Sequence, residues 1–131
     1  MIDNRVLAKV YNIGISPKIF ADRMERSSTL KFMEELSEMH RGRHIIVGVD
    51  RCDYSKGLPL KVEQFGVFLK RYPQWKGKVT LVQVAVPSRA GIAEYDKYKT
   101  RLAEAVLNVN GEHGSLLWEP IQLYSALLSS T

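Results

Sequence analysis

The sequence contains little cysteine and little histidine. Its single cysteine, Cys52, has no second thiol among the 131 residues with which to form a disulfide. The three histidines, His40, His44 and His113, are scattered along the chain without the spacing of zinc ligands. We therefore expect a fold that is stabilised neither by disulfides nor by a structural metal.

A long hydrophobic run is also absent. No apolar stretch approaches the ~20 residues that a membrane span needs. Residues 1–15 lack the charged, apolar and small-residue order of a secretory signal. We therefore expect a cytoplasmic protein without membrane association. Hydrophobic residues make up 45% and charged residues 25% of the chain, which excludes a disordered or collagen-like class.

The common glycine-rich nucleotide motifs are missing as well, since the sequence has neither a Walker A pattern nor G-x-G-x-x-G. The net charge of +5 attracts any anion. Lysine and arginine are spread along the chain, and the aromatic residues do not interleave with them as in RNA-binding motifs. Nucleic acid is therefore a poor candidate partner, and phosphorylated small molecules remain.

Apolar patterns alternate between strand-like runs and helical stripes. Residues 44–49 and 79–86 are β-branched runs without polar alternation, and we expect the first to be a central parallel strand covered on both faces. Residues 58–72 and 92–109 carry apolar side chains at helical spacing, and a left-handed cap at Asn110-Gly111 is expected to close the second helix.

The remaining patterns extend this alternation. They predict a strand at residues 6–15, a helix from Pro17 to about residue 23, a helix from Ser28, and no clear partner for residues 122–131. Strands alternating with helices predict an α/β fold, with a Rossmann-like parallel sheet and helices on both faces.

The most informative stretch is the charged loop of residues 48–57, Gly-Val-Asp-Arg-Cys-Asp-Tyr-Ser-Lys-Gly. The carboxyl ends of parallel strands open onto a crevice. We therefore expect Arg51 and Lys56 at its mouth, beside the free N–H groups of the next helix, where they favour phosphate. Gly57 permits close approach of the backbone to a ligand, or serves only as a turn residue. Arg89, which follows the next strand, is expected to face the same crevice.

Other interpretations of these residues stay open. A loop with two acids and two bases can satisfy itself if Arg51 and Lys56 pair with Asp50 and Asp53. Several further residues are better explained by local structure or packing than by chemistry. These are Cys52, His40, Tyr98 and the potential N-cap Ser88.

The motifs resemble one family. The loop Gly48-Val49-Asp50-Arg51-x-Asp53-Tyr54-x-Lys56-Gly57 is followed by Tyr72-Pro73-x-Trp75-x-Gly77-Lys78-Val79-x-Leu81-Val82-Gln83-Val84-Ala85-Val86-Pro87-Ser88-Arg89. Ile13-Gly14-Ile15-x-Pro17 precedes these motifs, and Asn110-Gly111-x-x-Gly114 and Pro120-Ile121 follow them. Together they resemble trehalose-6-phosphate synthase over roughly residues 10–121.

The resemblance implies a retaining glycosyltransferase of the GT-B fold that moves glucose from UDP-glucose to glucose 6-phosphate without a metal or cofactor. It implies that Arg51 and Lys56 hold the donor diphosphate, with Gly57 beside them, and that they stabilise the charge that develops as the glycosidic bond breaks. Arg89 is then the residue that reaches the phosphate of the acceptor. No protein nucleophile is required, because the leaving phosphate takes the acceptor's proton.

The resemblance also implies that residues 1–131 form part of the donor-binding domain, with the N-terminal acceptor domain and the C-terminal remainder absent. We expect the chain alone to be inactive. Two positions and one segment depart from the family pattern: Ser16 replaces an aspartate, Cys52 replaces an aliphatic residue, and residues 122–131 diverge. Association with other synthase subunits is expected. The alternative is a non-catalytic sugar-phosphate-binding or regulatory module that partners a complete synthase.

Overall fold

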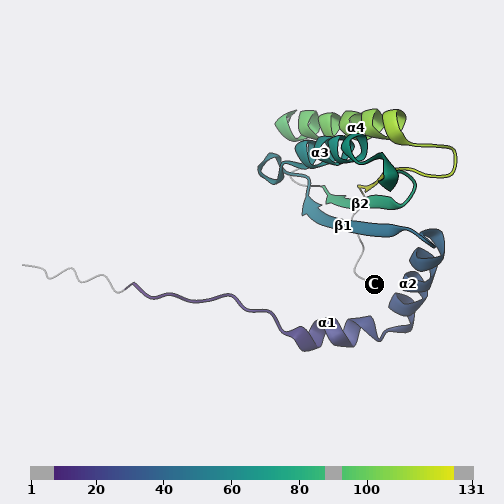
Figure 1. The fold of residues 1–131 in the computed structure, drawn as a ribbon. Helices are drawn as coiled ribbons and strands as arrows, with labels where there is room; N and C mark the ends of the chain where they lie inside the picture. Colours follow the sequence, from purple (N-terminus) through teal and green to yellow (C-terminus); the bar gives the residue numbers. More distant parts are fainter. Residues whose placement is uncertain (1–7, 88–92, 126–131) are drawn as a thin grey trace, which may run out of the picture. The chain divides into compact units, whose positions relative to one another are not determined.

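The computed structural model describes residues 8–87 and 93–125, and the chain divides into two compact units, Met1–Met39 and His40–Thr131. The first unit contains helices α1 (Pro17–Met24) and α2 (Ser27–Met39), which confirms the two helices predicted there (Figure 1). Pro17 occupies the first turn of α1, where its missing N–H has no helical partner to lose. The side chain of Ser16 precedes this helix without forming a cap hydrogen bond.

The strand predicted at residues 6–15 is wrong over the part that the structure describes. Residues 8–15 form no strand, and the side chain of Ile13 is fully exposed. A strand needs a neighbour that accepts and donates its backbone hydrogen bonds. The regular elements among the described residues of the first unit are helices, so residues 8–15 have no strand there with which to form backbone hydrogen bonds.

The second unit is built on a parallel sheet, which confirms the predicted α/β class. Its strands are β1 (His44–Arg51), β2 (Val79–Val86) and β3 (Ile121–Tyr124), in the order β1-β2-β3. Both pairings are parallel, with His44 opposite Val79 and Leu81 opposite Ile121. The first connection contains α3 (Leu58–Arg71) between two 3₁₀ turns, η1 (Tyr54–Lys56) and η2 (Pro73–Trp75), and the second contains α4 (Ala93–His113).

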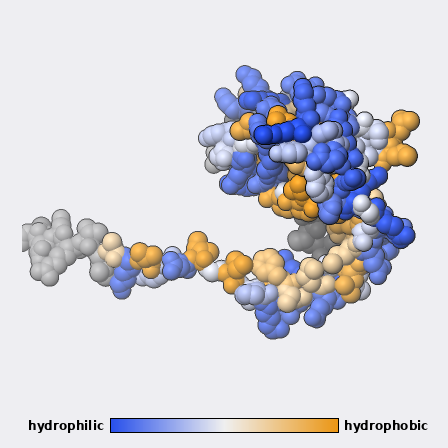
Figure 2. Space-filling view, viewed as in Figure 1, coloured by the Kyte–Doolittle hydropathy of each residue, from blue (hydrophilic) through white to orange (hydrophobic). Residues whose placement is uncertain are grey.

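Helices α3 and α4 lie side by side on the same face of this sheet (Figure 1). This follows from the strand order, because successive crossovers of the same hand step across the sheet in one direction. Gly66 of α3 permits the close approach, since a Cβ atom there would lie 2.9 Å from a methyl of Val109 on α4. Figure 2 shows the outward surface over the two helices as mostly hydrophilic.

The core of the second unit lies between these helices and the sheet. Its buried members are Cys52, Leu58, Val62, Phe65, Leu69, Val79, Leu81, Ala85, Leu102, Ala105, Val106, Val109, Trp118 and Ile121. The indole N–H of Trp118 donates to the hydroxyl of Thr80 at 3.0 Å and to the carbonyl of Val79 at 3.2 Å. Burial of these apolar side chains is the main stabilising contribution to the unit.

The prediction that residues 44–49 form a central, doubly covered strand is wrong within the described residues. There β1 pairs with β2 alone, and the side chains of Val47 and Val49 are 65% and 63% exposed. The central strand is β2, in which only Val84 and Val86 are less than fully buried. The β-branched run therefore predicted correctly that these residues form a strand. It did not predict the position of that strand in the sheet.

Two boundaries near the C-terminus also differ from prediction. Helix α4 continues through Asn110 and Gly111 to His113, and neither residue forms the expected left-handed cap. The chain leaves the helix at Gly114, whose N–H donates to the carbonyl of Asn110 at 2.8 Å. A Cβ at Gly114 would collide with that same carbonyl. Residues 122–124, for which no partner was expected, pair with β2.

Candidate functional site

The charged loop begins where β1 ends and is closed by a short 3₁₀ turn. Arg51 is the last residue of β1, and Lys56 is the last residue of η1. The carboxylate of Asp53 accepts a hydrogen bond from the N–H of Ser55 at 2.9 Å and so caps this turn. Gly57 follows at φ 60°, a left-handed conformation that favours glycine. The loop is thus shaped by its own residues, through the side-chain cap of Asp53 and the left-handed backbone of Gly57.

The acidic neighbour Asp50 is engaged elsewhere. Its Oδ2 accepts from the ammonium of Lys61 at 2.8 Å and from the amide of Gln83 at 3.1 Å. The hydrogen bond from Lys61 is the largest of the effects that hold the pKa of Asp50 below its ordinary value, and burial opposes it. The charge of Lys56 adds the weakest of these effects.

The two basic side chains of the loop are exposed and unpaired. Among the residues that the structure describes, neither Arg51 nor Lys56 makes a side-chain hydrogen bond or ion pair. The self-satisfied loop, in which these cations pair with Asp50 and Asp53, is therefore not the arrangement of the structure. Both cations are available to an anion from outside the described chain.

The first turn of α3 differs from the expected row of free N–H groups. The N–H of Leu58 donates to the hydroxyl of Tyr98 on α4 at 2.7 Å, and Pro59 has no N–H. Burial raises the pKa of Tyr98, and the hydrogen bond from Leu58 partly offsets this effect. Since these two positions offer no free donor, an anion at this corner would depend chiefly on side chains.

The structure brings the carboxyl ends of β1 and β2 together. Arg51 lies opposite Val86 in the register, and the N–H of Cys52 extends the ladder to the carbonyl of Val86 at 2.7 Å. Arg89 and Ser88, which follow β2, lie outside the described residues, so their roles stay predictions. The parallel register nevertheless supports the expectation that the segment after β2 starts beside the loop.

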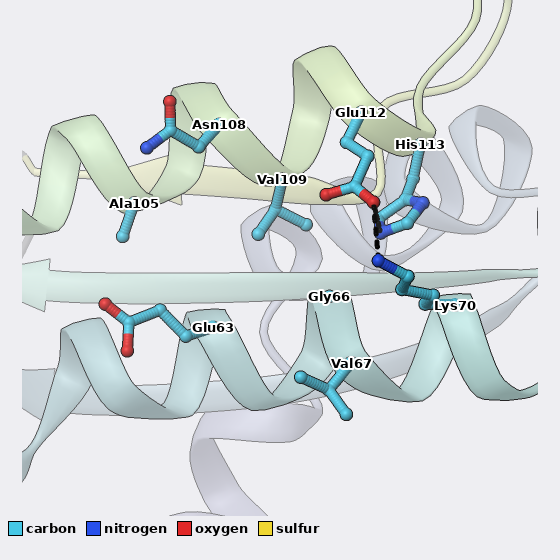
Figure 3. Close-up of a pocket in the computed structure, with 9 residues that line it drawn as sticks. All are labelled: Glu63, Gly66, Val67, Lys70, Ala105, Asn108, Val109, Glu112 and His113. Atoms are coloured by element: carbon cyan, nitrogen blue, oxygen red, sulfur yellow. Dashed lines mark ion pairs between the residues drawn. The ribbon is translucent and has the colours of Figure 1, made fainter.

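A cavity of about 280 Å³ lies elsewhere, between α3 and α4 (Figure 3). Its charged lining consists of the carboxylates of Glu63 and Glu112 and the ammonium of Lys70, with the buried ring of His113 at one end. The pair between Lys70 and Glu112 spans 3.9 Å. With two carboxylates against one ammonium, this cavity does not favour a diphosphate.

Cys52 and His40, the other potentially reactive side chains considered from the sequence, are both buried. Cys52 is buried in the core, as predicted, and burial raises the pKa of its thiol. His40 is also buried, and neither ring nitrogen has a hydrogen-bond partner within the described part of the chain. Over that same part, no cluster of histidine, cysteine and acidic side chains is suited to a metal ion. None of its helices is long and apolar enough to span a membrane.

Sequence reasoning missed three residues that organise the loop, namely Lys61, Gln83 and Tyr98. A signal existed for Gln83, because it is a polar residue in the middle of the apolar run 79–86. Its side chain is fully buried, which requires hydrogen-bond partners. Lys61 and Tyr98 resemble ordinary helix-surface residues in the sequence, and only the fold reveals their partners.

Comparison with known proteins assigns this arrangement to a family. The sequence profile of Glycosyltransferase family 20 matches residues 1–131. The chain belongs to glycosyltransferase family 20. A UDP-forming alpha,alpha-trehalose-phosphate synthase A from Dictyostelium discoideum is 39% identical over 119 residues, covering 91% of this chain and 16% of the relative. The 56 kDa subunit of the corresponding Saccharomyces cerevisiae synthase is 44% identical over 111 residues, covering 85% of this chain and 22% of the relative.

Solved structures of proteins named for trehalose-phosphate synthesis or dephosphorylation match at the level of the fold. The UDP-forming synthase of Burkholderia xenovorans in complex with glucose 6-phosphate has a TM-score of 0.81 at 29% identity, over 92% of this chain and 26% of that one. An E. coli structure bound with UDP-2-fluoro glucose has a TM-score of 0.83 at 31% identity, over 93% and 27%. The N-terminal domain of a Candida albicans trehalose-6-phosphate phosphatase has a TM-score of 0.79 at 29% identity, over 90% and 25%.

These matches confirm the predicted family and its GT-B fold. The chain spans 16% and 22% of the length of the two curated relatives.

Proposed function

We propose that this chain is the donor-binding segment of a UDP-forming trehalose-6-phosphate synthase, in which Arg51 and Lys56 hold the diphosphate of UDP-glucose. The observation that carries the proposal is that neither cation has a side-chain partner among the described residues, while Asp50 is bound by Lys61 and Asp53 caps the turn at Ser55. The segment lies at the carboxyl edge of a parallel sheet, where α/β folds bind ligands. Its similarity to proteins named as UDP-forming synthases supports the same assignment.

The residue types suit the reaction. The bond between the glucose anomeric carbon and the diphosphate oxygen breaks, and a bond forms to the anomeric oxygen of glucose 6-phosphate. The acceptor hydroxyl gives its proton to the leaving phosphate, so the products are UDP and trehalose 6-phosphate. Negative charge grows on the diphosphate during this step, and fixed cations stabilise that transition state more than the ground state. The guanidinium of Arg51 can bind two phosphate oxygens at once, and the ammonium of Lys56 acts as a mobile point charge.

Two further residues complete the proposed site. Gly57 lets the backbone approach the donor, and Arg89 reaches the phosphate of the acceptor. The reaction uses no metal or cofactor, because the two cations supply the charge that a metal would otherwise supply.

The proposal extends to the protein's location and partners. The protein works in the cytoplasm, away from membranes and nucleic acid. It associates with other synthase subunits, and the subunit name of the yeast relative supports this association.

A chimeric synthase tests the assignment. The matching 111-residue stretch of the yeast 56 kDa relative is replaced by the corresponding residues of this chain. UDP release is then measured with UDP-glucose and glucose 6-phosphate. We expect the chimera to turn over and the isolated 131-residue chain to be inactive. Arg51→Ala and Lys56→Ala should each lower kcat by about 100-fold or more, as expected when a transition-state charge partner is lost.

Lys76→Ala is the matched control, because it removes the same charge from an exposed position after η2. It should leave kcat within about twofold of the chimera, since isolated surface charges contribute little. Wild-type kinetics in both the Arg51 and the Lys56 variant would remove these residues from the donor site.

A non-catalytic sugar-phosphate-binding or regulatory module is the second candidate. The observation in its favour is the fold's occurrence in the N-terminal domain of a protein named as a trehalose-6-phosphate phosphatase. The same chimera discriminates between the two. A folded chimera without UDP release, which still shows amide shifts in residues 50–57 on titration with UDP, would favour the module. Amide shifts without turnover would thus separate binding from catalysis.

A further inference from the structure

Three side chains from three elements form a closed hydrogen-bonded ring behind the charged loop. The ammonium of Lys61 on α3 donates to Oδ2 of Asp50 on β1 at 2.8 Å and to Oε1 of Gln83 on β2 at 3.0 Å. The amide nitrogen of Gln83 donates to the same Oδ2 at 3.1 Å and to the carbonyl of Val84 at 3.0 Å. Every member of the ring therefore restrains the other two.

The ring is built into the fold. Gln83 has no exposed surface, and it occupies space beside Gly48 on the neighbouring strand, where a Cβ would collide with its side-chain oxygen. The absent side chain at Gly48 thus makes room for the amide. The side chains of Asp50 and Lys61 are 25% and 40% exposed, so the ring opens to solvent on the Asp50 and Lys61 side.

Asp50 has another cation in the same loop, because the charge of Lys56 already acts on its carboxylate. Arg51 follows Asp50 in β1, and consecutive side chains of a strand point to opposite faces, so Arg51 is not the competing partner. An aspartate released from Lys61 would gain by pairing with Lys56, because opposite charges at short range attract. A carboxylate paired with Lys56 would then compete with any anion for that cation.

We propose that Lys61 and Gln83 are positioning residues that keep the Asp50 carboxylate occupied, so that Lys56 stays available to the diphosphate beside Arg51. The inference rests on the proposed function for the identity of the anion, but the sequestration of Asp50 is a property of the free chain. Lys61 acts on the anion through Asp50 and does not bind it. This distinguishes it from a third diphosphate ligand.

The first experiment uses the full 131-residue chain without ligand. Side-chain NMR follows the Lys56 ammonium and the Arg51 guanidinium while the carboxyl group of Asp50 is titrated. In the wild-type chain the Lys56 signal should follow the titration only weakly, because the charge of Lys56 is the weakest of the effects on the pKa of Asp50. In Lys61→Met, which keeps most of the apolar stem and loses the charge, the Lys56 signal should follow it strongly. Identical behaviour in both chains overturns the proposal, whatever the chain binds.

The second experiment titrates the same chains with UDP, observed through the amide signals of residues 50–57. Lys61→Met should weaken UDP binding by about two- to fivefold, as expected for one competing pair at a partly exposed site. Lys61→Arg should retain the affinity. The double variant Lys61→Met with Asp50→Asn should recover it, because the neutral amide no longer competes for Lys56.

The recovery separates the possible roles of Lys61. If Lys61 merely stabilised the fold or bound the anion directly, Asp50→Asn would raise the affinity no more in the Lys61→Met chain than it does in the wild-type chain. That result overturns the proposal, as does an unchanged affinity in Lys61→Met. Thermal unfolding of each variant verifies that the compared chains are folded.

The two experiments also separate this inference from the proposed function. If the ligand-free titration shows the expected release of Asp50 but neither these chains nor the chimeric synthase binds UDP, the donor role of the loop fails while the sequestration stands. If UDP binds and the ligand-free signals do not respond to Lys61→Met, the donor role stands and the sequestration fails.

Discussion

The side-chain amide of Asn110 holds the backbone of Ile121 through two hydrogen bonds. Its Nδ2 donates to the carbonyl of Ile121 at 2.8 Å, and its Oδ1 accepts from the N–H of the same residue at 2.9 Å. Asn110 lies in the last turn of α4, and Ile121 is the first residue of β3. This pair therefore fixes where the third strand begins.

Asn110→Asp should destabilise the second unit by about 1–3 kcal/mol, because the variant loses the donor and places a carboxylate against the carbonyl of Ile121. Urea unfolding measures the free energy, and amide hydrogen exchange at Ile121 should accelerate. Asn108→Asp is the matched control on α4, where an exposed side chain lies beside the cavity between α3 and α4. Equal effects of the two substitutions would show that the added charge, and not the lost pair, is responsible.

Gly48→Ala should cost about 1–3 kcal/mol of folding free energy, because the new methyl would collide with the side-chain oxygen of Gln83. Gln83 is tied to Asp50, Lys61 and the carbonyl of Val84, so it cannot yield without breaking hydrogen bonds. The measurement is chemical denaturation of both chains.

Gly111→Ala provides the control for this substitution. This glycine lies inside α4 with open space around its Cβ position, so alanine should stabilise the chain by roughly 0.5–1 kcal/mol. If Gly48→Ala is as well tolerated as Gly111→Ala, the space at Gly48 has no role in the ring.

Tyr98→Phe should destabilise the start of α3 by about 1 kcal/mol, because the N–H of Leu58 loses its acceptor. Hydrogen exchange at the Leu58 amide should accelerate more than exchange in the middle of α3. Tyr72→Phe is the control, since no described residue hydrogen-bonds to the Tyr72 hydroxyl. Unchanged exchange at Leu58 would mean that a water molecule accepts the hydrogen bond from its N–H in place of the Tyr98 hydroxyl, with no loss of stability.

The depressed pKa of Asp50 predicts a loss of stability in acid. The group's pKa in the folded chain lies below the ordinary value of 3.8, chiefly because Lys61 donates a hydrogen bond to the carboxylate. Its contribution is therefore present above the ordinary value and is lost as the pH falls through the lower folded value. Unfolding free energies from pH 5 downward should decrease more steeply in the wild-type chain than in Asp50→Asn. Parallel curves would contradict this linkage.

Local pattern was sufficient for much of the fold. Residues 79–86 were predicted as a strand with the bounds that the structure shows, because a β-branched run is followed directly by Pro87. The face of α3 was likewise visible in the spacing of Leu58, Val62, Phe65 and Leu69. Such features depend on neighbours in the chain, which a sequence displays directly.

Features that depend on distant partners were not visible. An edge strand and a central strand share the same composition, so the exposure of Val47 and Val49 could not be anticipated from their run. Asn110 was expected to cap its own helix, but its amide binds β3 instead. The basic residues of the loop were identified, whereas the partner of Asp50 comes from a helix surface that sequence pattern cannot distinguish from other surfaces.

The order of the strands, β1-β2-β3, is also the order in which a ribosome makes them. Each new strand pairs with the one synthesised immediately before it, and its crossover helix is complete by then. The three described strands of the second unit can therefore close one crossover at a time, each pairing with a strand that has already been translated.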